Sequence, residues 1–253
     1  MGKNKLKKFA EIDRMDCVFQ YPRERLLNEG FPLKGRWKKD FFGNTNAMTL
    51  ELGCGKGEYT VGLASHNPDN NFIGVDIKGA RLWSGAKTVE EQGLKNAAFI
   101  RTEIENICSF FDTDEVDEIW ITFPDPQMQK PRKRLTSTRF MNLYGNILKP
   151  GGVIHLKTDS PFLYEYTRRL IVENGFEVLR DTSDLYGSGL ADPQTAIKTF
   201  YESQWLSRGK KIKLLSFKPR FNVELIEPFT DDIPKDDYRA YTRHNPQLSS
   251  PQH

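Results

Sequence analysis

Three glycines alternate with other residues directly after a predicted buried strand at 48–52. The segment reads Glu51-Leu-Gly-Cys-Gly-Lys-Gly57, and a predicted helix follows at 58–66. Glycines let the backbone pass close to a ligand, and the helix start offers free amides. The dinucleotide fingerprint is GxGxxG, whereas this loop is GxGxG with an acid before it. A carboxylate there would repel a pyrophosphate but suits a cation, such as the amino group or sulfonium of S-adenosylmethionine; a plain tight turn is the alternative. The candidate binding residues are Glu51, Gly53, Gly55 and Gly57.

Two further acids follow predicted strands. Asp76 ends the strand at 70–76, where an acid can accept hydrogen bonds from both hydroxyls of a ribose. Nicotinamide dinucleotides and S-adenosylmethionine both carry that ribose, so Asp76 alone does not indicate which of the two cofactors binds. Glu103 follows the strand at 97–102. It either accepts a hydrogen bond from the adenine amino group, and so binds the cofactor, or is an exposed acid at a helix start.

Asp125 stands between two prolines directly after the predicted strand at 117–123. Proline restricts the backbone on both sides and so holds the acid in one direction. A basic run, Lys130-Pro-Arg-Lys-Arg134, comes next. A fixed carboxylate beside side chains that attract phosphate indicates a nucleobase substrate within a nucleic acid. A turn residue without chemistry is the alternative for Asp125 alone.

The charge of the chain is uneven although its sum is only +3. Basic residues outnumber acids over 1–40, and the windows 127–139 and 208–220 contain lysine and arginine but no acid. Such clusters on a nearly neutral protein indicate either a face that binds a polyanion or separate solvated loops. The 1–40 segment could be a basic arm that becomes ordered on binding RNA.

Size and composition exclude several classes of protein. The chain has 253 residues, 38% of them hydrophobic, which allows one large domain with a sizeable core. No apolar run is long enough for a transmembrane helix, and the basic start lacks the apolar region of a secretory signal. Three cysteines without a CxxC pair favour a reduced, cytoplasmic protein with neither a disulfide framework nor a zinc site.

Strands and helices alternate along the chain, which predicts βαβ units in an α/β fold with a doubly wound, mostly parallel sheet. An additional strand within 211–226 is expected to be antiparallel. We divide the chain into a basic extension (1–40), a central domain (41–228) and a C-terminal tail (229–253). Strands are predicted at 48–52, 70–76, 97–102, 117–123, 153–159 and 176–182, and helices at 58–66, 79–93, 104–111, 137–148 and 161–174.

Five segments together resemble the bacterial tRNA (guanine-N7)-methyltransferases over roughly residues 45–205. The segment after the fourth strand is the most diagnostic, whereas the glycine loop is generic to class I methyltransferases. The resemblance implies a Rossmann-like methyltransferase fold. It also implies methyl transfer from S-adenosylmethionine, leaving S-adenosylhomocysteine, to a guanine in the variable loop of tRNA. The matching segments are LELGCGKGEY, FIGVDIKGARLW, TFPDPQMQKPRKRLTSTRF, LKPGGVIHLKTDSPFLYEY and TFYESQWLSRG.

The resemblance also implies roles for individual residues. Asp125 matches the catalytic carboxylate and also binds the cofactor, together with the loop residues named above, Asp76 and Glu103. Asp159 and the stretch from Thr199 to Glu202 match positions near the substrate guanine. The predicted RNA-binding residues are Lys130, Arg132, Lys133, Arg134, Asp159, Thr199 and Glu202.

The chain departs from the family pattern after Asp125. The family usually has tryptophan where this chain has Gln127. Its substrate-binding lysine aligns with Gln129, or with Lys130 if the loop slips by one residue. The segment 183–196 is longer than usual and aligns poorly.

Guanine N7 has an in-plane lone pair and no proton, so its methylation needs alignment and desolvation rather than a strong base. Asp125 would stabilise the charge that develops on the ring, while Asp159 or Glu202 holds the edge with N1 and N2. His155 lies inside a strand and is expected to be a packed core residue. Two rivals stay open: a nicotinamide-dependent oxidoreductase and a noncatalytic RNA-binding module. The partner is expected to be tRNA, without metal or membrane, and the protein a monomer or homodimer.

Overall fold

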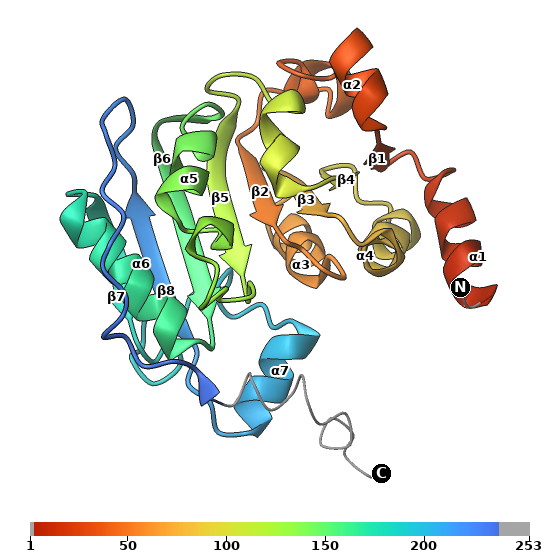
Figure 1. Ribbon diagram of the computed structural model, residues 1–253. Helices are drawn as coiled ribbons and strands as arrows, with labels where there is room; N and C mark the ends of the chain where they lie inside the picture. The colour runs from red at the N-terminus through yellow and green to blue at the C-terminus, as the bar shows by residue number, and fades with distance from the viewer. Residues whose placement is uncertain (1–2, 238–253) are drawn as a thin grey trace.

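A computed structural model describes residues 3–237 and shows an eight-stranded sheet with helices on both faces (Figure 1). The strand order is β1-β4-β3-β2-β5-β6-β8-β7. Neighbouring strands are parallel except at β8, which is antiparallel to both β6 and β7. The predicted mostly parallel sheet with an antiparallel strand near the C-terminus is confirmed. The strands are β1 (Val18–Gln20), β2 (Met48–Leu52), β3 (Asn71–Asp76), β4 (Ala97–Arg101), β5 (Val116–Thr122), β6 (Leu148–Thr158), β7 (Glu177–Thr182) and β8 (Lys213–Lys218).

The five predicted helical segments are present, with two local differences, and residues 3–237 contain three further α-helices that the sequence did not predict, at 3–12, 23–29 and 200–207. The predicted helix at 104–111 is a 3₁₀ helix, η2 (Ile104–Ser109). The helix predicted at 137–148 ends at Tyr144, because Leu148 already pairs with Val116 as the first residue of β6. None of the helices within residues 3–237 has the length and apolar character needed to span a bilayer. The α-helices are α1 (Lys3–Ile12), α2 (Arg23–Glu29), α3 (Glu58–His66), α4 (Gly79–Gln92), α5 (Thr138–Tyr144), α6 (Pro161–Glu173) and α7 (Phe200–Ser207).

The central strands are buried on both faces, as parallel strands covered by helices must be. Every residue of β2 is buried, and alternate side chains point to opposite sides. Leu50 and Leu52 join a core that includes Phe140 of α5 and Phe162 of α6. Glu51 points the other way, toward α3. The alternation of the strand therefore places this carboxylate beneath the helix that follows the glycine loop.

The N-terminal segment is part of the domain, and the prediction of a separate basic arm over 1–40 is wrong for its described residues. β1 forms the edge of the sheet beside β4. Trp37, in the short π-helix η1 (Trp37–Phe41), is fully buried, and its indole nitrogen donates to the Phe110 carbonyl at 2.9 Å. Phe19 and Phe31 contact its ring edge-on or tilted. These aromatic contacts anchor the segment to the domain, although most of its charged residues are exposed.

The predicted C-terminal tail begins as part of the same packing. Ile233 is buried in the core under α6, and Asp236 is buried beside the start of that helix. The Asp236 carboxylate accepts hydrogen bonds from the Ser160 hydroxyl and, at 3.1 Å, from the Phe162 amide. The expected tail therefore starts later than residue 229. Residues 238–253, including His244, lie outside the described residues.

Candidate active site

The glycine loop between β2 and α3 adopts backbone angles that favour glycine. Gly53, Gly55 and Gly57 have φ values of 77°, 57° and 72°. A Cβ on Gly57 would lie 2.6 Å from the Phe99 ring, so this position must also be small to let α3 approach the sheet. A Cβ on Gly55 would meet nothing within 4 Å. The loop is thus held tightly from below and is open on the side where a ligand would approach.

Asp76, at the end of β3, is bound to the backbone around it. Its Oδ2 accepts a hydrogen bond from the Gly55 amide at 3.0 Å, and its Oδ1 accepts one from the Lys78 amide at 2.7 Å. The next residue, Ile77, leaves 48% of its surface exposed. An exposed isoleucine directly after the acid is a feature that the sequence argument missed, and it offers an apolar face beside the carboxylate that is predicted to bind a ribose.

Glu51 is only 2% exposed and does not stand at the mouth of the loop as expected. Its Oε2 accepts from the Thr60 amide at 2.9 Å and from the Thr60 hydroxyl at 2.5 Å. Its Oε1 accepts from the Thr122 hydroxyl at 2.6 Å. Burial raises the pKa of Glu51 to about 7, although these hydrogen bonds oppose the shift. The carboxylate therefore joins β2, α3 and β5 beneath the ligand side of the loop.

The turn after β5 holds Asp125 between two strained residues. Phe123 and Gln127 are not glycine, yet they have φ values of 49° and 47°. Such angles are uncommon for residues with a Cβ and persist where the surroundings enforce them. Asp125 is exposed, and one of its carboxylate oxygens accepts from the Gln127 amide at 3.1 Å. The structure thus presents this carboxylate at the carboxyl edge of the sheet on a constrained turn.

The four predicted cofactor acids follow four adjacent strands. Glu51 lies near the end of β2, Asp76 ends β3 and Asp125 follows β5. Glu103 follows β4, is exposed, and makes no side-chain cap to η2. Because these strands are parallel neighbours, the structure brings all four positions to one edge of the sheet.

A buried ion pair lies at the β6 end of this edge and joins β6 to α7. Lys157 of β6 and Glu202 of α7 are both fully buried, and Lys157 Nζ donates to Glu202 Oε2 at 2.8 Å. Lys157 also donates to the carbonyls of Thr195 at 2.7 Å and Ile197 at 3.0 Å. Burial lowers the pKa of Lys157, and the Glu202 carboxylate partly offsets this effect. Lys157 therefore fastens the 183–199 connection and α7 to the end of β6, a role that the sequence argument missed.

This arrangement argues against Glu202 as the residue that holds the guanine edge. Its second carboxylate oxygen accepts from the Tyr186 hydroxyl at 2.6 Å, so both oxygens are engaged inside the protein. Thr199 is also buried and caps α7 by accepting from the Glu202 amide at 3.1 Å. Asp159 is buried as well, with its backbone carbonyl accepting from Lys213. All three residues are buried, and their assignment to the substrate site stays a prediction.

The basic run after Asp125 divides into exposed and buried members. Lys130, Arg132 and Lys133 are exposed, as expected of residues that contact phosphates. Arg134 is only 1% exposed and lies over the rings of Phe162 and Tyr166, at 4.9 and 4.4 Å from their centroids. The expected phosphate contact by Arg134 does not fit this placement, because its guanidinium is enclosed between the turn and α6.

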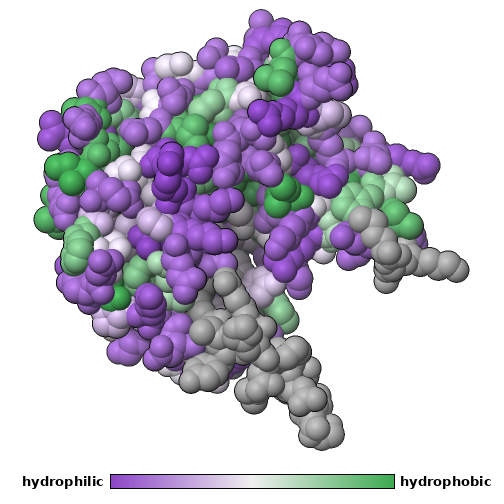
Figure 2. All heavy atoms as spheres, viewed as in Figure 1, coloured by the Kyte–Doolittle hydropathy of each residue, from purple (hydrophilic) through white to green (hydrophobic). Residues whose placement is uncertain are grey.

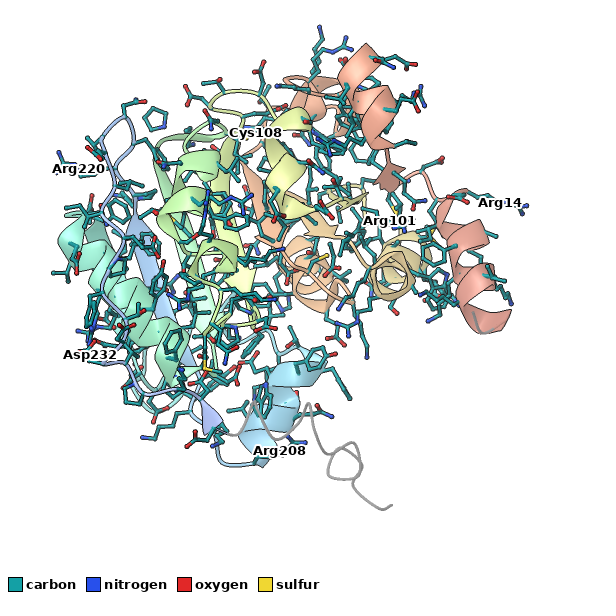
Figure 3. All side chains as sticks on the ribbon, viewed as in Figure 1. Arg14, Arg101, Cys108, Arg208, Arg220 and Asp232 are labelled. Carbon is teal, nitrogen blue, oxygen red and sulfur yellow. The ribbon has the colours of Figure 1, made fainter. Side chains whose placement is uncertain are left out.

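The cluster at 208–220 does not form one basic face. Figure 3 shows Arg208 beside the end of α7 and Arg220 at the opposite end of β8. Hydrophilic side chains cover most of the face seen in Figure 2. Of this cluster, Arg208 is the arginine that lies at the α7 end of the sheet.

His155 is a core residue, as expected. Its ring stacks on Trp120, with the centroids 4.1 Å apart, and its two nitrogens lie 2.7 Å from the Ser216 hydroxyl and 3.0 Å from the Glu118 carboxylate. These contacts engage both nitrogens of the ring inside the protein, so the ring cannot contact a substrate.

Comparison with known proteins agrees with this geometry. Residues 45–215 match a family model described as a putative methyltransferase. The chain is 54% identical over 243 residues to the tRNA (guanine-N(7)-)-methyltransferase of Bacteroides fragilis, with 96% of each protein covered. It is 55% identical over 232 residues to the protein of that name from Porphyromonas gingivalis, covering 89% of this chain and 94% of that protein. The chain belongs to the tRNA (guanine-N(7)-)-methyltransferase family.

Solved structures of low identity share the fold of this tRNA methyltransferase family member. The 16S rRNA methyltransferase KamB superposes with a TM-score of 0.55 at 13% identity, over 72% of this chain and 92% of that chain. An antibiotic-related methyltransferase superposes with a TM-score of 0.54 at 17% identity, over 71% and 90% of the two chains. The expected class I methyltransferase fold is confirmed.

Gln127 marks where this tRNA methyltransferase departs from the family pattern. Its carbonyl accepts from the Lys130 amide at 2.9 Å and from the Arg134 guanidinium at 3.3 Å. These two contacts fix the turn that follows Asp125 without the usual tryptophan. Gln129 and Lys130 are both exposed, so the assignment of the substrate-binding lysine stays a prediction.

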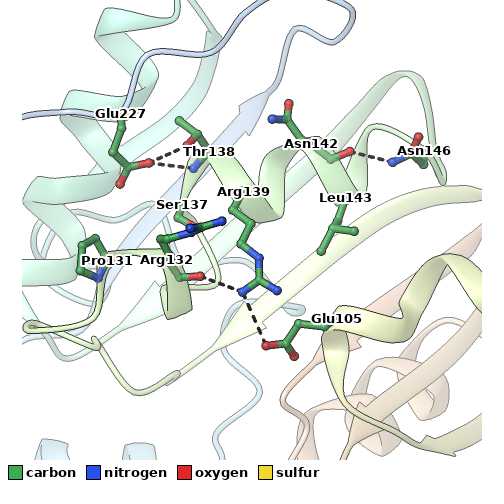
Figure 4. A pocket seen from close by; sticks show the side chains of 10 residues that line it. All are labelled: Glu105, Pro131, Arg132, Ser137, Thr138, Arg139, Asn142, Leu143, Asn146 and Glu227. Carbon is green, nitrogen blue, oxygen red and sulfur yellow. Dashed lines mark hydrogen bonds and ion pairs between the residues drawn. The ribbon is translucent and has the colours of Figure 1, made fainter. Parts of the chain in front are cut away.

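A cavity of about 630 Å³ lies beside the basic run, between α5 and η2 (Figure 4). Arg132 and Arg139 both line it, and an Arg139 nitrogen donates to the Arg132 carbonyl at 3.3 Å. Glu105 lies 3.8 Å from Arg139, and Glu227 accepts from the Thr138 amide and hydroxyl. Two arginines and two acids therefore line this cavity, and Arg139 is paired with Glu105.

Proposed function

We propose that this protein transfers the methyl group of S-adenosylmethionine to N7 of a guanine in the variable loop of tRNA. The observation that carries the proposal is the carboxyl edge of the sheet. There the open glycine loop and the acids after β3, β4 and β5 meet in a chain that shares more than half its residues with tRNA (guanine-N(7)-)-methyltransferases.

The residues at this edge fit the cofactor. The ligand side of Gly55 is open, and Asp76 lies where it can accept hydrogen bonds from ribose hydroxyls. Ile77 supplies an apolar face for the adenine, with Glu103 near its amino group. Glu51 supports the loop from beneath through its hydrogen bonds to Thr60 at the start of α3. The cofactor, when bound, supplies the electrophilic methyl group.

Asp125 is the residue we propose as catalytic. N7 presents a lone pair, so the protein needs only to align it and to exclude water. The strained turn from Phe123 to Gln127 holds the Asp125 carboxylate in place before substrate arrives. A preorganised negative charge lowers the energy of the cationic ring that forms as the methyl group is transferred.

Exposed Lys130, Arg132 and Lys133 would contact the phosphates of tRNA, which makes binding salt-dependent. Within residues 3–237 no cluster of His, Cys, Asp and Glu side chains could hold a metal ion. The absence of a metal requirement and the oligomeric state stay predictions. We place the protein in the cytoplasm because its three cysteines are unpaired and two of them are buried.

Methylation of unmodified tRNA tests the function directly. Borohydride reduces 7-methylguanine and so creates an abasic site that aniline cleaves, and this treatment of the product should give one cut in the variable loop. Absence of cleavage in every tRNA tried would leave the noncatalytic RNA-binding alternative. Equilibrium dialysis separates the remaining rival, since preferential binding of NAD over S-adenosylmethionine would contradict the proposal.

Asp125→Ala tests the assigned chemistry. We expect kcat to fall roughly a hundredfold or more, the scale of losing a preorganised charge, with a much smaller change in tRNA affinity. Asp69→Asn is the matched control, because Asp69 is an exposed acid at the opposite, amino end of β3 and should leave turnover unchanged. Loss of tRNA binding in Asp125→Ala would mean that its role is misassigned.

A further inference from the structure

Two adjacent aromatic residues are exposed at the start of α7. Phe200 and Tyr201 leave 49% and 41% of their surfaces accessible, and their ring centroids are 6.0 Å apart in an edge-to-face arrangement. The family resemblance covers the stretch from Thr199 to Glu202, but neither aromatic ring has a role in the mechanism above. Exposing two large rings side by side costs solubility unless a ligand covers them.

The pair is held rigidly. The Phe200 amide donates to the Glu58 carboxylate at 2.8 Å, which ties the start of α7 to the start of α3. Thr199 caps the helix on one side, and Glu202 anchors it to buried Lys157 on the other. The rings therefore do not depend on the ligand for their position.

Cations accompany both rings. Lys56, inside the glycine loop, lies with its ammonium 4.3 Å from the Phe200 ring centroid. The Arg81 guanidinium of α4 lies 6.0 Å from the Tyr201 ring centroid. Lys198, directly before the pair, is exposed. The nearby acid Glu58 is engaged with the Phe200 amide, so the patch presents aromatic faces among positive charges.

That combination fits unpaired nucleotides. Bases stack on aromatic rings, and lysine and arginine take the phosphates between them. An apolar protein partner would not be matched by three cations at the centre of its contact, because interface cores are depleted of lysine. A preorganised platform also suits a splayed RNA loop better than a duplex, whose bases are already stacked.

The patch lies close to the proposed catalytic turn. Lys157 Nζ, which contacts Glu202 of α7, is also 5.9 Å from the ring centroid of Phe123, two residues before Asp125. Figure 1 shows α7 below the carboxyl ends of the central strands. One buried side chain thus connects the aromatic patch to the Asp125 turn.

We propose that Phe200 and Tyr201 are a stacking platform for unpaired tRNA bases that adjoin the methylated guanine, with Lys56 and Arg81 binding the phosphates of those nucleotides. The proposal rests on the function given above and extends it to specificity. The platform holds the loop open so that the target base reaches the cofactor, and it favours tRNAs whose neighbouring nucleotides are unpaired.

The test uses the full chain and the double variant Phe200→Leu/Tyr201→Leu, which keeps apolar side chains but removes both rings. We expect tRNA affinity to weaken roughly tenfold or more, the effect of losing one or two base stacks, while affinity for S-adenosylmethionine is unchanged. The matched control is Phe229→Leu, because Phe229 is 65% exposed but lies on a different surface, where its carbonyl accepts from Arg169. Its tRNA affinity should equal that of the wild type.

A fluorescent base gives a second readout. With 2-aminopurine beside the target guanine, binding to the wild-type protein should quench the fluorescence by stacking, and the double variant should lose this quenching. Unchanged tRNA affinity and quenching in the double variant would overturn the proposal. Weakened S-adenosylmethionine binding would also overturn it, because the rings would then belong to the cofactor site. Wild-type protein that methylates no tRNA would instead refute the function itself.

Discussion

The two sides of the carboxyl edge are built from different kinds of contact. On the side of β2 and β3, the geometry comes from the backbone: positive-φ glycines and amides that donate to Asp76 from residues nearby in the fold. On the side of β6 and α7, it comes from one buried ion pair between residues 45 apart in the chain. The first arrangement therefore depends on several backbone contacts close to the loop, whereas the second depends on one pair of side chains.

Breaking the Lys157–Glu202 pair should have the largest effect. Lys157→Met or Glu202→Leu alone leaves a buried charge without its partner and should lower the free energy of unfolding by about 3–5 kcal/mol. The double variant should be more stable than either single variant, because it leaves no charge uncompensated. Urea denaturation measures this.

The surface pair Arg25–Glu29 provides the control for that experiment, since both side chains are exposed at a 2.8 Å separation. Glu29→Gln should leave the urea midpoint unchanged. If the Lys157 and Glu202 single variants behaved like this control, the α7 side would not depend on its buried pair.

Glu51 should make stability depend on pH. Its pKa is about 7 in the folded protein against an ordinary value of 4.5, so the folded state holds the proton more tightly than the unfolded state. The stabilisation is complete below pH 4.5 and is lost as the pH rises toward 7, by up to about 3 kcal/mol. The difference in unfolding free energy between wild type and Glu51→Gln, measured from pH 4 to 8, should follow this fall. A constant difference would show that Glu51 does not titrate in this range.

Gly57→Ala should damage the cofactor side specifically. The added Cβ meets the Phe99 ring at 2.6 Å on a backbone with φ of 72°, so we expect a loss of about 1–3 kcal/mol and weaker S-adenosylmethionine binding. Gly93→Ala separates the backbone strain from the steric clash. Gly93 has φ of 64°, so the variant is strained, but the space around its Cβ position is open. Equal losses of stability in the two variants would mean that strain alone, and not the clash with Phe99, matters.

The smallest effect is expected on tRNA affinity when a single side chain that contacts a phosphate is removed. Arg132→Ala should weaken tRNA binding and reduce the slope of log affinity against log salt by about 1, because one counterion-releasing contact is lost. Arg134→Met should leave that slope unchanged and instead reduce stability, since Arg134 is enclosed over Phe162 and Tyr166. The reverse pattern would restore the phosphate role that the sequence suggested for Arg134.

The sequence predicted what depends on local spacing. The strands from β2 to β6, the glycine loop and the position of each acid at a strand end follow from short patterns in which neighbouring residues specify the turn. The fold and the family are confirmed. The individual cofactor and substrate contacts are supported by geometry and stay predictions until they are measured.

The predictions that were wrong concern residues whose burial depends on contacts with distant parts of the chain. Arg134 and Glu202 carry charges that look alike in the sequence whether they are solvated or buried. Arg134 is covered by the rings of Phe162 and Tyr166 on α6, and Glu202 pairs with Lys157 on β6, and these contacts join distant parts of the chain. The N-terminal segment was assigned from its lysines and arginines, although Phe19, Phe31 and Trp37 among them carried the apolar signal. A count of charges gives every ionised residue the same weight, whereas the position of this segment is decided by a few buried aromatic rings.

The position of β8 has a consequence for synthesis of the chain. This strand is made after β7 yet lies between β6 and β7, so β7 has no neighbour until residues 213–218 have left the ribosome. A product terminated before residue 213 would lack an interior strand rather than a dispensable end, and the open side of β6 would be a template for aggregation.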